Sequence, residues 1–98
     1  MAFWYEEIWA EESGGHNFSE VKTVNIPSNS VLVSCALQEV NQQGGGGQAK
    51  MAITQYVQNG DPHEGNWQMI NGKGITSVTF ALTVNNAAAQ GTGLIQTV

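Results

Sequence analysis

Segment 74–84 alternates apolar and polar side chains over nearly its whole length. A period of two, in β-branched and aromatic residues, is typical of a strand with one buried face. The pattern predicts a strand with a core face opposite a row of hydroxyls that faces water or a partner. The core face would carry Val78, Phe80, Leu82 and Val84, and the hydroxyl row Ser77, Thr79, Ala81 and Thr83.

Residues 28–40 form a second strong strand candidate. One face would carry Val31, Val33, Cys35 and Leu37. Leu32 and Ala36 make the opposite face partly apolar as well, which is typical of a central strand covered on both sides. Cys35 is the only cysteine, so the chain has no internal disulfide, and we expect its thiol in the core.

Residues 48–58 alternate less regularly. Met51, Ile53 and Val57 fall on one face, Tyr56 falls on the other, and Gln55 interrupts the apolar face. The stretches 18–26, 66–70 and 91–98 are shorter strand candidates. All four stretches are bounded by Gly, Asn or Pro, which favour turns.

The N-terminal segment 3–12 carries most of the aromatic residues. As a helix it would place Trp4, Tyr5, Ile8 and Trp9 on one face, and as a strand it would align Phe3, Tyr5 and Trp9. We favour the strand because aromatic residues are enriched in strands. We expect the aromatic cluster to pack into the core, although it could also form an interface.

Turn residues separate these runs at 13–15, 41–48, 59–66, 71–74 and 85–93. Short strands at a spacing of about ten residues indicate a sandwich or barrel. We predict that residues 1–98 form one all-β domain with about six to seven short strands. An antiparallel β-sandwich is the expected architecture, with a barrel as the alternative.

Composition argues against several classes of partner. The net charge is −5, with three lysines and no arginine, so we expect neither nucleic acid nor anionic lipid as a partner. Only 11% of the residues are charged, and Asn, Gln, Ser and Thr take their place. A surface of amides and hydroxyls suits glycan contacts and subunit packing.

Targeting signals are also missing from the sequence. The N-terminus has no basic n-region, and no apolar run approaches the roughly 18 residues of a transmembrane helix. We expect synthesis in a cytosol, followed by release or incorporation into a particle, and the final location stays open.

No catalytic or phosphate-binding motif appears. The run Gly44–Gly47 precedes a predicted strand and lacks the Lys-Ser/Thr ending of a P-loop, so it indicates a hairpin loop. His16 and His63 belong to no metal-binding motif, and Ser13 beside His16 lacks a nucleophile elbow. We therefore expect a non-enzymatic protein with no catalytic residues and no cofactor.

The stretch 58–67, QNGDPHEGNW, is the best candidate ligand site. Sugar recognition combines an aromatic plane with amides and carboxylates that bind hydroxyls. Trp67 would supply the plane, and the candidate hydrogen-bonding residues are Asn59, Asp61, His63, Glu64 and Asn66. The oxygen donors would also suit calcium, although the spacing is not that of an EF-hand. A purely structural turn is the simpler alternative.

Three classes of function remain. The first is a small, multivalent, carbohydrate-binding protein of lectin type that forms homo-oligomers. From Ile26 to Val84 the order and length of the strand-forming segments resemble those of H-type lectins, which implies a sandwich; no diagnostic motif of that family is present, so no site residue is carried over. The second class is a structural subunit of a virion, fibre or filament. The third is a membrane-active toxin that uses its N-terminal aromatics.

Overall fold

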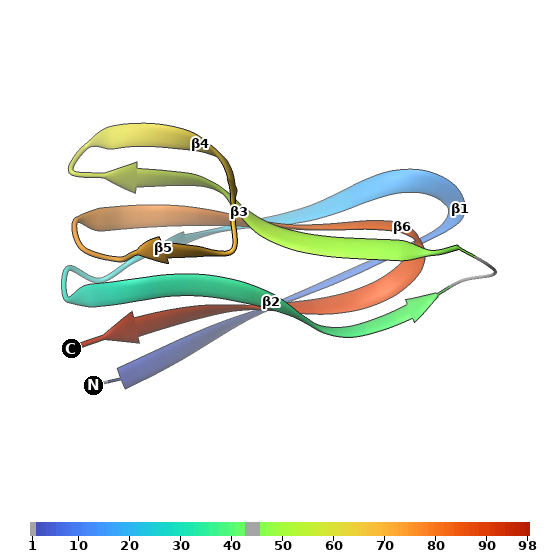
Figure 1. Cartoon of the computed structure of the whole chain (residues 1–98), viewed down its shortest axis with the longest axis horizontal. Coiled ribbons are helices and arrows are strands. Elements are labelled where there is room, and N and C mark those ends of the chain that lie inside the picture. The colour runs from blue at the N-terminus through green and yellow to red at the C-terminus, as the bar shows by residue number, and fades with distance from the viewer. Residues whose placement is uncertain (1, 43–45) are drawn as a thin grey trace.

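The computed structural model describes residues 2–42 and 46–98 as six antiparallel strands of one sheet curled into a half-barrel (Figure 1). The strands are β1 (Ala2–Asn25), β2 (Ser30–Gln42), β3 (Gln48–Gln58), β4 (Asp61–Trp67), β5 (Met69–Asn71) and β6 (Ile75–Thr97). The predicted all-β antiparallel fold is confirmed. Residues 2–42 and 46–98 contain no helix long and apolar enough to cross a membrane. Gly44 and Gly45 of the predicted glycine loop lie outside the described residues.

Strand β6 is the centre of the sheet. Along one edge it pairs with β1 from end to end, and along the other it pairs first with β3 and then with β2. Both long strands bend at the same end of the molecule, opposite the two chain termini (Figure 1). The bend of β6 is at Asn86, which has a φ of 50°. The bend of β1 falls in residues 13–16, where its pairing register shifts.

These bends divide the sheet into two half-sheets. The first half-sheet contains the first arm of β1 (residues 2–12), residues 87–97 of β6, β2 and β5. The second contains the second arm of β1 (residues 17–25), residues 75–85 of β6, β3 and β4. The inner faces of the two half-sheets meet in the core, and β1 is the edge strand of both.

The core confirms the alternation predicted for residues 74–84. Val78, Phe80, Leu82 and Val84 are fully buried, while the hydroxyl row lies on the outer face. In β2 only the middle of the predicted face, Val33 and Cys35, is buried. Ala36 on its other face is exposed, so the prediction that β2 is covered on both sides is wrong.

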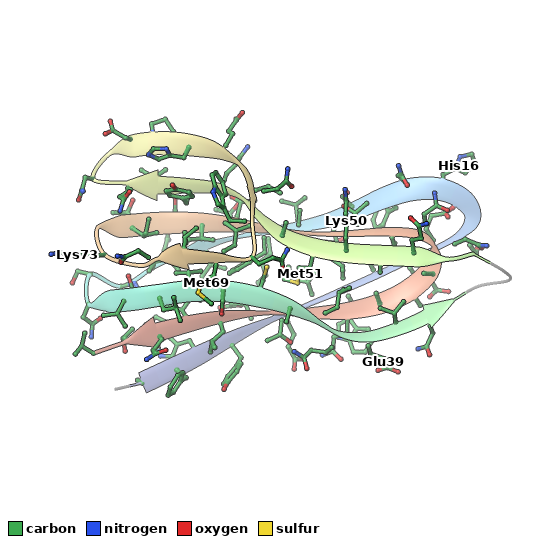
Figure 2. The ribbon with its side chains drawn as sticks, in the orientation of Figure 1. His16, Glu39, Lys50, Met51, Met69 and Lys73 are labelled. Carbon is green, nitrogen blue, oxygen red and sulfur yellow. The ribbon has the colours of Figure 1, made fainter. Side chains whose placement is uncertain are left out.

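The prediction of a turn over 85–93 is also wrong for residues 87–93, which follow the bend at Asn86. Residues 87–97 continue β6, and every second residue faces the core. A Cβ on Gly93 would lie 2.6 Å from the Phe80 ring, and a Cβ on Gly91 would collide with the sulfur of Met51. Met51 lies near the middle of the molecule (Figure 2). The small residues are therefore part of the core, where they leave space for large side chains of the facing half-sheet.

The irregular pattern of 48–58 comes from a β-bulge. The pairing of β3 with β6 shifts between Ile53 and Gln55. One extra residue reverses the alternation that follows it. Tyr56 therefore pairs with core residue Val78, and Val57 pairs with Ser77 on the outer face, the reverse of the predicted assignment.

Candidate binding surfaces

The predicted ligand loop is mostly a strand. Asn59 and Gly60, with φ of 50° and 85°, form a two-residue turn, and residues 61–67 return along β3 as β4. A positive φ at both central positions is the geometry of a type I′ hairpin turn, which favours Asn-Gly. The prediction of a loop over 59–66 is wrong, because only Asn59-Gly60 is needed to reverse the chain.

The six predicted site residues do not converge on one point. His63 stacks on Tyr56 with ring centroids 4.7 Å apart, and Trp67 meets Tyr56 edge-on at 4.8 Å. Glu64 lies on the opposite face of β4, where Gln55 Nε2 donates to its Oε1 at 3.5 Å. Asn59, Asp61 and Asn66 are exposed, and their side chains make no hydrogen bond within the described residues.

Trp67 does not present a free ring for stacking. It is half-buried, packs against the core and lies over Gly65, where an added Cβ would be 2.8 Å from its ring. The ring contacts of Tyr56 therefore orient Trp67 as part of an aromatic cluster at the edge of the core. The predicted stacking role of Trp67 stays a prediction.

A shallow cavity of about 200 Å³ lies on the outer face of the second half-sheet. Its polar lining is made of side chains that neighbour one another across four strands. Thr23 and Thr79 share a hydrogen bond of 2.9 Å, and Gln55 and Glu64 follow them in register. Hydroxyls, an amide and a carboxylate on one surface can bind a polyhydroxylated ligand.

The histidines and the cysteine take part in no metal-binding cluster within the described residues. No three His, Cys, Asp or Glu side chains lie close enough there to hold a metal ion. His16 projects at the end where β1 bends, away from β4 (Figures 1 and 2). Desolvation by burial raises the pKa of the Cys35 thiol, so the reactive thiolate is disfavoured.

Glu12 is a structural carboxylate at the bends. It accepts hydrogen bonds from the backbone N–H of Asn86 at 3.0 Å, of Gly14 at 2.7 Å and of His16 at 3.1 Å. These bonds, chiefly that of Asn86, lower the pKa of Glu12 despite some desolvation. One side chain therefore joins the bend of β1 to the bend of β6.

Among the described residues, β1 carries more exposed large hydrophobic side chains than any other strand. Its N-terminal aromatics are exposed, so the expectation that they pack in the core is wrong: Tyr5 is 66% and Trp9 60% exposed. Phe3, Tyr5 and Trp9 lie on the outer face, and Trp4 and Phe18 lie on the inner side. The available signal was that a strand over 3–12 places Glu7 and Glu11 on the same face as the aromatic residues. A buried face rarely carries glutamate.

The two arms of β1 border the open side of the half-barrel. Lys22 Nζ of the second arm binds Glu6 Oε2 of the first at 2.8 Å. Beside this ion pair, a cavity of about 380 Å³ lies between Glu7, Ile8 and Trp9 on one arm and Glu20, Val21 and Lys22 on the other. Within the described residues, no strand pairs with the outer edge of either arm.

Comparison with known proteins assigns the chain to no family. No protein-family model, curated protein or solved structure matches the chain. The resemblance of segment order to H-type lectins therefore gains no support.

Proposed function

We propose that this protein is a non-enzymatic assembly subunit whose copies join through β1. The observation that supports this most directly is the outer edge of a 24-residue strand, which pairs with no other strand of the described residues. An exposed edge presents a row of backbone N–H and C=O groups to any other strand, and natural proteins usually shorten, cover or interrupt such edges.

The exposed hydrophobic side chains agree with edge pairing. In the described residues, β1 carries six exposed large hydrophobics, Phe3, Trp4, Tyr5, Trp9, Phe18 and Val21. They project from both faces of the strand. A ligand lying on one face would leave the other face exposed, whereas a strand added to the edge would contact side chains on both.

Sedimentation velocity over a wide range of protein concentrations tests this function. We expect assemblies that dissociate on dilution, and we expect Trp9→Ser to weaken them. Met69→Ser is a matched control, because Met69 is equally exposed at 61% but lies on β5, at the edge of the first half-sheet opposite β1. A monomer at every concentration would refute the proposal.

Glycan binding is a second candidate function, favoured by the cavity beside Glu64. A glycan array with Glu64→Gln would test it. Losing a charge-assisted hydrogen bond of about 1.5–3 kcal/mol should weaken binding roughly ten- to a hundredfold. Asp61→Asn is the comparison, since Asp61 is an exposed acid of β4 that does not line the cavity. Equal binding by both variants and the parent would contradict a site on this hairpin.

A further inference from the structure

We propose that two copies of the chain pair through the second arm of β1, antiparallel and about a two-fold axis at Val21. The proposal rests on the proposed assembly function and specifies its interface. It would join the second half-sheets of two molecules into one continuous sheet. Val21 is 55% exposed at the middle of this edge.

The second arm is self-complementary in this register. In its sequence, NFSEVKTVN, residues at equal distances on either side of Val21 are chemically alike, except that Glu20 and Lys22 carry opposite charges. The cross-strand pairs would be Asn17 with Asn25, Phe18 with Val24, Ser19 with Thr23 and Glu20 with Lys22, each formed twice by symmetry. Aromatic with β-branched, hydroxyl with hydroxyl and opposite charges are the stabilising cross-strand combinations.

The structure places the members of each pair on the same face. Pairing with β6 puts Ser19, Val21 and Thr23 on the outer face and Glu20 and Lys22 on the inner side. Ser19 already bonds Thr83 at 2.7 Å, and Thr23 bonds Thr79 at 2.9 Å. Joining Ser19 to Thr23 of the second copy would continue these hydroxyl rows across the interface.

Neighbouring registers are disfavoured. A shift of the axis to Glu20 would oppose Glu20 to its own copy, and a shift to Lys22 would do the same with lysines. Like charges directly opposite each other are destabilising. An axis between two residues would pair outer with inner side chains, which a continuous sheet does not allow. Among these neighbouring registers, only the axis at Val21 satisfies both charge and face, and it places Glu20 opposite Lys22.

The charges are available for this contact. Glu20 makes no hydrogen bond or ion pair within the described residues, while Lys22 reaches Glu6 of its own chain and remains 46% exposed. Lys22 would then lie between Glu6 and Glu20 of the second copy. A lysine ammonium has three donors, so one carboxylate does not exhaust it.

The first arm is compatible with the same axis. Ile8 and Val21 are the middle residues of the two triplets that line the cavity between the arms. An axis at Ile8 would place Tyr5 opposite Glu11, Glu6 opposite Ala10 and Glu7 opposite Trp9. No two glutamates of the first arms would then face each other directly, although these arms carry four glutamates each.

Charge-swap mixing tests the register. Glu20→Lys alone would oppose lysine to lysine, and Lys22→Glu alone would oppose glutamate to glutamate. We expect each variant to dimerise at least about tenfold more weakly than the parent. In a mixture of the two variants every opposed pair is again of opposite charge, so sedimentation should show a restored dimer containing both.

Crosslinking tests the axis independently of charge. We expect Val21→Cys to form an intermolecular disulfide rapidly under mild oxidation, because the axis brings the two introduced thiols together. Met69→Cys is the control for chance encounters, and Cys35 is buried in both proteins.

The outcomes separate the two proposals. Dimers that both charge variants form unweakened, with no Val21→Cys crosslink, would overturn this interface and leave assembly through another surface. A chain that stays monomeric in every sample would overturn the assembly function as well.

Discussion

At the residue scale, the packing of small against large side chains is the most specific feature of the core. Gly93 faces the ring of Phe80, which is fully buried. We expect Gly93→Ala to destabilise the fold by about 1–3 kcal/mol, because the added methyl overpacks this contact. Chemical denaturation would measure it, with the outer-face neighbour Thr92→Ala as control.

A second substitution shows whether contact with Phe80 causes the destabilisation expected for Gly93→Ala. Phe80→Leu should relieve part of the cost of Gly93→Ala, so the two effects would not add. Phe80→Ala by itself should cost about 3–5 kcal/mol. Additive effects of Phe80→Leu and Gly93→Ala would contradict a direct contact between the two positions.

Glu12 gives a prediction of pH dependence. Its pKa is lowered from the ordinary 4.5 in the folded protein, chiefly by the backbone N–H of Asn86. A lowered folded pKa means that its stabilisation is complete above the ordinary pKa and is lost as the pH falls through the lowered one. Glu12→Gln should therefore melt below the parent at pH 7, and the gap should close in acid.

The neighbouring glutamate provides the control for this experiment. Glu11 is exposed and makes no hydrogen bond within the described residues, so Glu11→Gln should melt like the parent at each pH. Thermal melts by circular dichroism between about pH 2 and pH 7 would compare the three proteins. A gap for Glu12→Gln that stayed constant with pH would show that its charge is irrelevant.

At the element scale, the β3–β4 hairpin depends on its two-residue turn. Gly60 has a φ of 85° and empty space where a Cβ would lie. Gly60→Ala should cost about 1–2 kcal/mol from backbone strain alone, without any clash. Asn66→Ala, on the exposed part of β4, is the control for the denaturation measurement. A parent-like midpoint for Gly60→Ala would mean that the turn adopts another conformation.

Some elements could be predicted from the sequence, and others could not. Turn residues on either side predicted the limits of β3 correctly, and periodicity predicted the buried face of residues 74–84. Periodicity was insufficient for residues 87–93, because alanine and glycine have little strand propensity of their own. Those residues form a strand because β1 and β2 pair with both of its edges.

At the scale of the whole molecule, the proposed assembly through the outer edge of β1 predicts a concentration-dependent stability. An assembly that only the folded chain can form stabilises that chain by mass action. We expect the melting temperature to rise with protein concentration, and this rise to be lost in Glu20→Lys. Differential scanning calorimetry at a low and a high concentration would measure both proteins. Equal melting temperatures for the parent would argue against assembly of the folded state.

The sequence by itself determined the class of fold, the core face of residues 74–84 and the Asn59-Gly60 turn. These depend on local chemistry, namely the period of two and the φ preferences of Asn and Gly. Only the tertiary structure decided that the N-terminal aromatics are exposed, that Tyr56 faces inward and that residues 61–67 form a strand. The reason is physical: exposure depends on which strand becomes an edge, and pairing between segments as distant as Ala2 and Thr97 sets that.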